Sequence, residues 1–438
     1  GMNGISYYAS NQWRAAASKP KHLAAICVWE GWNDNYRESN RHGGIACSFR
    51  KNWLEMQIKT VQHGVGDRGK RSPITGDTVC GPETLSPEEL LKNVSDIWKI
   101  VLENEFISDW YKERSAKLDR VDIPVLSSAN WGGQGLHTRG NFEGFVRSKS
   151  KHKWLEVHGG SHWAPFYTDY GVALQKRFFD HYLKGKKNGW KKTAPISLLV
   201  RSPGEKFVQR DEKEWPLKRT QWTTLHLNPQ GMTFSQDPIT ENAQVTYDMM
   251  GDGVTFAFPP QKQEVELTGP MALKLFISST TVDADIFAVV RIYDKENKEV
   301  LFHGALDPKT PVAQGWLRAS HRKLDKKKSL PYRPWHSHDQ KQALVPGQVY
   351  ELDVEIWPTC IVVPVGYRIA LTIRGKDYEH DGAAAVLSNM KNPMKGCGPF
   401  VHDDEVDRPP AIFGGKVTLH MGPKQKANLL LPVIPKKK

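Results

Sequence analysis

The spacing of apolar positions changes several times along the chain. Residues 11–19 form an amphipathic stretch, and the apolar run 23–29 that follows is typical of a buried strand. The same order returns further on, with a strand at 123–128, a helix through Arg147 and a strand at 153–157. Alternating strands and helices of this kind predict a mainly parallel sheet.

Between these two parts the pattern differs. The stretch from about residue 30 to 81 is polar and rich in glycine, which predicts loops with some helix. Ser86 then provides a capping side chain ahead of Pro87 and two glutamates, and apolar positions recur at helical spacing as far as Leu118. We therefore expect a helical cap insert inside the α/β part.

After residue 194 short segments of alternating apolar residues replace the strand and helix units, and this pattern predicts a β-sandwich or jelly roll. The expected fold class is α/β plus all-β, a core around a mainly parallel sheet with a helical insert, followed by a jelly roll. The expected divisions are 1–63 and 121–194 for the core, 64–120 for the insert, and 195–438 for the jelly roll.

Composition narrows the class of protein. The 438 residues, 39% hydrophobic and 10% aromatic, can bury two cores. A net charge of +13 comes from scattered lysine runs without an accompanying aromatic stripe, which argues against a nucleic-acid groove. No apolar run reaches the ~18 residues of a membrane span. Five cysteines without a paired spacing favour a reducing, cytoplasmic setting over a disulfide framework or a zinc site.

Ser6 is the leading candidate nucleophile. Gly4 stands two residues before it and the small Ala9 three after it, at the start of an amphipathic helix, as a sharp nucleophile elbow requires. The same pattern also occurs at an ordinary helix N-cap. His162, on a loop after a predicted buried strand, is the candidate base, with His158 as its nearest competitor among 16 histidines.

Further motifs add to these candidates: the elbow at 4–13, Ser161-His162, the segment 178–185, and in the second domain the segments 282–286 and 316–322. Across essentially the whole chain, these motifs resemble the cocaine esterase and X-Pro dipeptidyl-peptidase group of α/β-hydrolases, which carry a C-terminal jelly roll.

The resemblance implies a partial α/β-hydrolase core with a helical cap insert, followed by a jelly-roll β-sandwich. It also implies the roles of several residues. Ser6 matches the family's nucleophile and His162 its general base, and the backbone N–H of Tyr7 would donate to the oxyanion. The reaction would be acyl transfer to water, with no metal or organic cofactor and with a small ester or amide as substrate. Neither nucleic acid nor membrane is expected as a partner, and a homo-oligomer stays an open alternative.

The third member of the triad departs from the family pattern. The family's acid follows the strand that ends near Ser128, but this chain reads Asn130-Trp131-Gly132-Gly133 there, without a carboxylate. Related folds supply the acid after the strand that follows the nucleophile helix, where Glu30 and Asp34 stand. Either could substitute, or both could brace a loop, and Glu143 is a more distant alternative.

A second departure lies at the front, where a short segment precedes Ser6. We expect the strand leading into Ser6, and the earlier strands of such a sheet, to lie outside this sequence. The family's second oxyanion donor, an upstream tyrosine, would then be missing as well. Such a polypeptide alone would be inactive or poorly folded.

Three functions remain in view. An esterase or amidase is favoured, an X-Pro dipeptidyl-peptidase is the alternative in the same class, and a catalytically degenerate binding or assembly protein is the alternative outside it. Asp283 and Asp285 resemble a calcium pair but are expected to cap a turn, and no metal is assigned.

Overall fold

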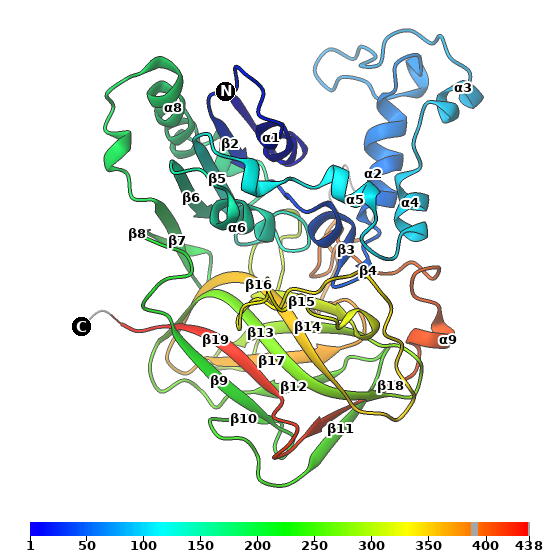
Figure 1. The fold of residues 1–438 in the computed structure, drawn as a ribbon, viewed down its shortest axis with the longest axis vertical. Helices are drawn as coiled ribbons and strands as arrows, with labels where there is room; N and C mark the ends of the chain where they lie inside the picture. Colours follow the sequence, from blue (N-terminus) through cyan, green and yellow to red (C-terminus); the bar gives the residue numbers. More distant parts are fainter. Residues whose placement is uncertain (387–392, 437–438) are drawn as a thin grey trace.

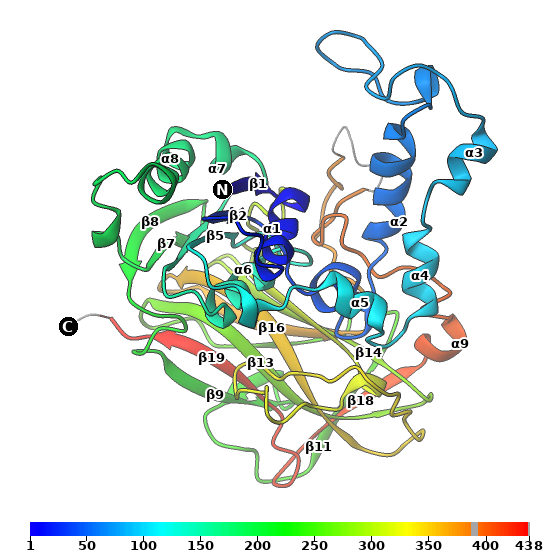
Figure 2. The same cartoon turned by 45° about the horizontal axis from the view of Figure 1, so that its top comes forward.

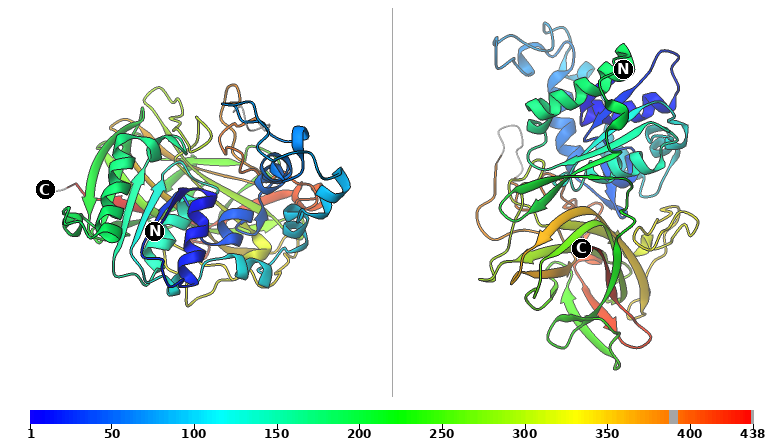
Figure 3. Two further views of the ribbon diagram at one scale, coloured as in Figure 1. Left: turned by 90° about the horizontal axis from the view of Figure 1, so that it is seen from above. Right: turned by 90° about the vertical axis from the view of Figure 1, so that its left-hand side faces the viewer.

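A computed structural model describes residues 1–386 and 393–436. The chain forms two bodies stacked on one another (Figure 1; Figure 3, right). The upper body is an α/β-hydrolase core around a six-stranded sheet, and the lower body is all-β. The fold class expected from the sequence is therefore confirmed.

The first sheet has the order β1-β2-β5-β6-β7-β8, parallel except for the antiparallel last pair. Helices cover both of its faces. The strands are β1 (Met2–Ile5), β2 (Ile26–Trp29), β5 (Val125–Asn130), β6 (Lys153–His158), β7 (Ile196–Ser202) and β8 (Lys206–Glu212), and the helices are α1 (Tyr7–Ala17), α6 (Thr138–Arg147), α7 (Ala164–Tyr167) and α8 (Asp169–Lys184).

Strand β2 shows why the apolar run becomes a central strand. Ile26 and Val28 pack with α1 on one face, whereas Cys27 and Trp29 pack against Phe178 of α8 on the other. Side chains of a strand alternate between faces, so a continuous apolar run suits a sheet covered on both sides.

The strand that leads into Ser6 was expected outside the sequence, and the structure corrects this. Residues Met2–Ile5 form β1, which pairs in parallel with the whole of β2 from Met2 opposite Ile26 to Ile5 opposite Trp29. Four residues suffice because β2 is itself four residues long. Within the described residues β1 is an edge strand of the sheet.

The helical insert is broken into short pieces. The capping box at Ser86 forms as expected, but the helix that it starts ends at Lys92. Asp96 caps the next helix with its side chain, and the third begins after Ser108. These polar residues compete for backbone hydrogen bonds and interrupt the apolar spacing. The insert projects from the sheet on the side of α2 (Phe49–Trp53), α3 (Pro87–Lys92) and α4 (Ile97–Glu103) (Figure 2).

The remaining elements of the upper body are short, and several are single turns. They are η1 (Asn35–Asn40), β3 (Arg41–His42), β4 (Ile45–Ala46), α2 (Phe49–Trp53), η2 (Leu54–Ile58), η3 (Lys59–Val61), η4 (Gly66–Arg68), α3 (Pro87–Lys92), α4 (Ile97–Glu103), α5 (Asp109–Arg114), η5 (Leu118–Arg120) and η6 (Trp190–Lys192).

The lower body is one antiparallel sheet of eleven strands that curls around a large apolar core. Its elements are β9 (Gln221–Asn228), β10 (Thr233–Ser235), β11 (Ala243–Asp248), β12 (Val254–Ala257), β13 (Val265–Ser279), β14 (Asp285–Tyr293), β15 (Ala313–Arg318), η7 (Ala319–His321), β16 (Tyr350–Val363), β17 (Arg368–Arg374), α9 (Pro410–Phe413), β18 (Lys416–Met421) and β19 (Asn428–Ile434).

Strands β7 and β8 differ from the expected division at residue 195. They belong to the first sheet, because β7 pairs in parallel with β6 and β8 pairs with β7. Their alternating apolar pattern is the same as that of the jelly-roll strands, and only the pairing partner distinguishes the two. The first sheet thus continues to Glu212.

Candidate active site

Ser6 lies in the sharp turn between β1 and α1. Its backbone has φ 60° and ψ −115°, outside the regions that most side chains adopt. The turn is held because the Ser6 N–H donates to the carbonyl oxygens of Trp29 and Glu30, at 3.0 and 3.1 Å. A Cβ at Gly4 would stand 2.7 Å from Tyr8 Cβ, so the elbow requires glycine there. The strained turn points the Ser6 side chain out of the helix.

The closest side-chain partner of Ser6 is a histidine that the sequence did not single out. Ser6 Oγ lies 3.2 Å from Nε2 of His137, the N-cap residue of α6. Burial, and after it the neighbouring His162, lowers the pKa of His137 well below its ordinary range. This ring is therefore neutral at physiological pH and can accept the hydroxyl proton in a hydrogen bond.

His162 stacks on His137, with ring centroids 4.9 Å apart and planes 12° from parallel. Its Nδ1 lies 2.6 Å from Oε2 of Glu30, and the contact requires a proton on Nδ1 because a carboxylate only accepts. Nε2 of His162 is then an acceptor. The loop that carries His162 is held by the lower body, since its N–H donates to the carbonyl of Ala305 at 2.8 Å.

Glu30 directly follows β2 and is completely buried. Burial alone would raise the pKa of its carboxyl group, but the contacts with His162 and His158 lower it to about 2. His158 Nε2 lies 3.1 Å from Glu30 Oε1, and its Nδ1 lies 2.9 Å from Oε2 of Glu156. Burial would lower the pKa of His158, but Glu156 and Glu30 raise it to about 9. A charged His158 thus stabilises the ionised form of Glu30 through Oε1, the oxygen that does not contact His162.

Asn130 occupies the place where the family pattern would put a carboxylate turn. Its amide donates to Glu30 Oε1 at 3.2 Å and to the carbonyl of Gly160 at 2.8 Å, and its oxygen accepts from the N–H of Gly132. The turn through Gly133 therefore contributes an orienting amide to the glutamate that follows β2.

The other acid candidates lie elsewhere. Asp34 accepts from the N–H groups of Tyr36 and Arg37 and pairs with the Arg37 side chain at 2.8 Å, so it caps the turn η1. Glu143 pairs with Arg333 at 2.7 Å, facing the lower body. Of the candidate acids, Glu30 alone contacts a histidine of this cluster among the described residues.

The N–H of Tyr7 is in the first turn of α1, where helix N–H groups lack intrahelical partners. Beside Tyr7 opens a cavity of about 410 Å³. Trp32 forms part of its wall, and the centroid of its ring lies 5.8 Å from that of His137. Three arginines and one acid also line the cavity: Arg14, Arg50, Arg114 and Glu113.

In the part of the chain that the structure describes, two sets of side chains have the donor atoms and spacing to hold a metal ion. Glu30, His137 and His162 bring ligand atoms within 4.8 Å of one another, but this set includes the partner of Ser6. The second set, His42, Cys47 and His402, lies outside the site. At the pair singled out in the sequence, Asp285 binds Arg318 at 2.9 and 3.0 Å, and Asp283 accepts from two backbone N–H groups.

Within the described residues, no helix has the length and apolar character needed to cross a membrane.

Comparison with known proteins gives consistent matches. Residues 1–164 match the X-Pro dipeptidyl-peptidase (S15 family), and residues 188–426 match the X-Pro dipeptidyl-peptidase C-terminal non-catalytic domain. The crystal structure of a CocE/NonD family hydrolase from Staphylococcus aureus is 30% identical, with a TM-score of 0.83, and the match covers 98% of this chain and 71% of that one.

Relatives with lower sequence identity belong to the same group of hydrolases or carry related names. The cocaine esterase of Rhodococcus sp. strain MB1 Bresler is 20% identical over 99% of this chain and 80% of its own length. A Mycobacterium bovis protein whose name assigns it provisionally to the serine esterases is 29% identical over 36% of this chain, and the match spans 23% of that relative's length. The chain therefore belongs to the cocaine esterase and X-Pro dipeptidyl-peptidase (S15) family of α/β-hydrolases.

Proposed function

We propose that the chain carries the catalytic serine, base and acid of a serine hydrolase that cleaves esters through an acyl-enzyme. One observation carries the proposal. Ser6 stands on a strained elbow against a stacked histidine pair, and the outer histidine of that pair is held by the buried carboxylate of Glu30 at 2.6 Å. This arrangement supports assigning Ser6 as the nucleophile, His162 as the base and Glu30 as the orienting acid, by analogy with other serine hydrolases.

His162 is the proposed general base. Glu30 fixes the proton on Nδ1 and stabilises the imidazolium that forms when Nε2 takes the proton of Ser6. His137 lacks a carboxylate partner among the described residues, and its lowered pKa makes it a weak base. We assign it the role of holding the Ser6 hydroxyl in the resting enzyme. A small rotation of the Ser6 side chain would move its hydroxyl from His137 to His162. We expect this move when substrate binds, because catalytic hydrogen bonds often form fully only in the substrate complex.

The reaction then proceeds in two halves. Ser6 Oγ attacks the ester carbonyl, its proton moves to His162 Nε2, and the N–H of Tyr7 donates to the developing oxyanion. His162 returns the proton to the leaving alcohol, and the acyl group stays on Ser6. Water attacks the acyl-enzyme with His162 again as base, which releases the acid and restores the serine.

The cavity beside Tyr7 favours an ester over an X-Pro peptide. A dipeptidyl-peptidase must hold a charged amino terminus, for which a carboxylate is the natural partner. Of the described residues around this cavity Glu113 is the only acid, and it is 3.5 Å from Arg114, whereas three arginines contribute positive charge. An ammonium group would be repelled here, and a neutral or anionic acyl group would be accepted.

Fluorophosphonate labelling of the full native polypeptide tests the proposal. Wild-type protein should be labelled and Ser6→Ala should not, while Ser18→Ala, at an exposed hydroxyl at the end of α1, should be labelled like wild type. Turnover of short acyl p-nitrophenyl esters, with little cleavage of an Ala-Pro p-nitroanilide, would support the esterase. The reverse preference would establish the peptidase, and no labelling of folded protein would favour the degenerate binding protein.

A further inference from the structure

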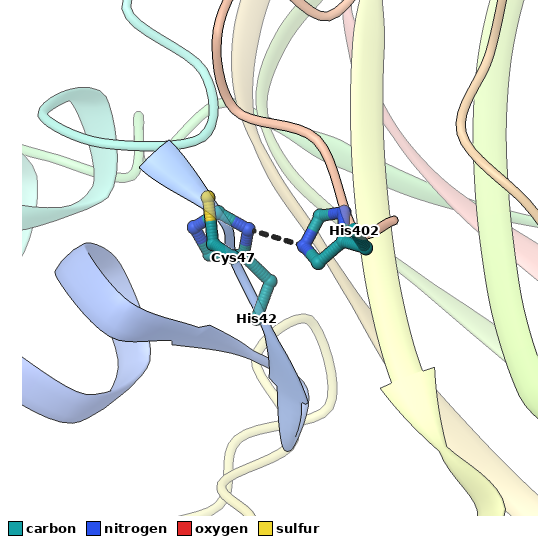
Figure 4. A group of neighbouring side chains, drawn as sticks. All are labelled: His42, Cys47 and His402. Atoms are coloured by element: carbon teal, nitrogen blue, oxygen red, sulfur yellow. Dashed lines mark hydrogen bonds between the residues drawn. The ribbon is translucent and has the colours of Figure 1, made fainter. Parts of the chain in front are cut away.

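Two histidines and a cysteine meet at the boundary between the two bodies, away from Ser6. His42 ends the two-residue strand β3, Cys47 follows β4, and His402 lies on the loop between β17 and α9. Figure 4 shows the two imidazoles facing each other with the Cys47 sulfur beside the His42 ring. All three side chains are buried, and one ligand atom from each lies within 4.8 Å of the others.

We propose that His42, Cys47 and His402 form a zinc site that joins the two bodies. Two imidazoles and one thiolate are a donor set that zinc prefers. The proposal concerns a site separate from the Ser6 cluster and does not depend on the proposed reaction.

The geometry is close to that of a bound ion. His42 Nδ1 lies 2.8 Å from His402 Nε2. A tetrahedral zinc with bonds of about 2.0 Å to nitrogen would hold two such atoms about 3.3 Å apart. The rings need to separate by about half an ångström, a shift that the loop carrying His402 can accommodate. A neutral hydrogen bond between the rings occupies the same two nitrogens, so ion and hydrogen bond exclude each other.

The surroundings orient one ligand. His402 Nδ1 lies 2.8 Å from Oδ1 of Asp377, which directs the Nε2 lone pair of His402 toward the centre of the cluster. A carboxylate behind a ligating histidine is the usual arrangement in zinc sites. His402 provides the sole ion-pair contact of Asp377 among the described residues. A dication, a Cys47 thiolate and the Asp377 carboxylate sum to zero charge, as burial favours.

The backbone holds the two ligand-bearing segments side by side. The N–H of Ser48 donates to the carbonyl of Val401 at 2.9 Å, so the residues next to Cys47 and His402 are joined directly. The ring of Trp316 lies against that of His42 at a tilt, with centroids 4.7 Å apart, and with Trp357 it covers the cluster on the side of the lower body.

The remaining side offers access. A cavity of about 700 Å³ is lined by His402 and Asp377 and leads to the surface. It can admit the ion and supply water as the fourth ligand, which three protein ligands leave open. We therefore expect one zinc ion per chain with a structural role, since its ligands come from both bodies.

Metal content of the full native polypeptide, purified with a tag that contains no histidine, tests the site. Elemental analysis should find close to one zinc per chain in the wild type and less than about a tenth of that in Cys47→Ser and His402→Ala. Cys80→Ser removes a buried thiol of the insert, outside the cluster, and should retain the zinc. Cobalt substitution should give a thiolate charge-transfer absorption in wild type and Cys80→Ser that is lost in Cys47→Ser.

Folding of each variant is checked by circular dichroism and by a cooperative thermal unfolding transition, so that loss of metal is not mistaken for loss of structure. Zinc should raise the unfolding temperature of metal-depleted wild type but not of Cys47→Ser. Folded wild type without zinc and without cobalt absorption would overturn the proposal and leave a neutral hydrogen bond between the rings. Zinc that is retained in Cys47→Ser and lost in His162→Ala would also overturn it, by placing the ion at Glu30, His137 and His162.

Discussion

The substitution Glu30→Gln tests the role of the buried carboxylate with little change of shape. Glu30 Oε2 is 2.6 Å from His162 Nδ1, and the side chain is fully buried, so the glutamine amide must take the same place. The amide can turn an N–H toward His162 and stabilise the tautomer that carries its proton on Nε2. That tautomer cannot accept the proton of Ser6.

The size of the effect follows from the tautomer. In trypsin the corresponding loss of the acid's charge lowers kcat about 10⁴-fold. We expect a fall of about 10³- to 10⁴-fold here, or about 4 to 5.5 kcal/mol in the activation barrier. KM should change little, because Glu30 is not among the residues that line the cavity beside Tyr7.

Asp34→Asn is the matched control. Asp34 is the other acid that the sequence offered after β2, and its carboxylate caps η1 and pairs with Arg37. Asparagine caps as well as aspartate, so kcat should stay within about threefold of wild type. The assay is steady-state hydrolysis of a p-nitrophenyl ester, with thermal unfolding as a check on folding. Loss of activity in Asp34→Asn with activity kept in Glu30→Gln would refute the reasoning.

Three further predictions follow from the same contacts. The rate constant of single-turnover acylation should fall at least about 10³-fold in His162→Ala but only about tenfold in His137→Ala, which is the effect of losing one hydrogen bond. The opposite order would make His137 the base. The raised pKa of His158 contributes stability that is complete below pH about 6.5 and is lost as pH rises through about 9. The free energy of unfolding, measured with denaturant, should therefore fall over this range in wild type and change less with pH in His158→Gln. Gly4→Ala places a Cβ 2.7 Å from Tyr8 Cβ, so it should lower the free energy of unfolding by about 1 to 3 kcal/mol and slow the labelling of Ser6. Gly347→Ala, also at positive φ but in open space, should lower it less, and equal losses would show that crowding at the elbow is unimportant.

The sequence predicted the parts of the fold that depend on local pattern. The structure contains each of these predicted parts, with boundaries shifted by a few residues: the elbow at Ser6, the strand β2, the helix α6 that ends at Arg147, and the strand β6 that ends at His158. Each was indicated by periodicity or by glycine and capping residues close in sequence. The family resemblance was confirmed as well.

Strand partners were not predictable in the same way. Segment 196–202 has the alternating pattern of a jelly-roll strand, yet it pairs with β6 of the first sheet. Similarly, the segment before Ser6 is too short for its sequence pattern to predict a strand, and it forms one because it pairs with β2. Pairing over such distances depends on tertiary contacts that a local pattern does not contain.

His137 was missed for a related reason. In a parallel sheet the residues that follow neighbouring strands meet at one edge, and here Glu30 follows β2, His137 lies beyond β5, and His162 lies beyond β6. Given the order β2-β5-β6, the proximity of the three would have been expected. Without it, a histidine before an amphipathic helix has no feature that separates it from the other fifteen.

The position of Glu30 also explains why several neighbours are polar in an otherwise apolar core. A fully buried carboxylate is costly unless each oxygen is satisfied. Here His162 contacts one oxygen, while His158 and Asn130 contact the other. If the acid stood after β5, as in the family pattern, His158 and Asn130 would have no such role. The proposed acid and the residues that contact it therefore form one unit, and placing a carboxylate at position 133 instead would require replacing His158 and Asn130 together with Glu30.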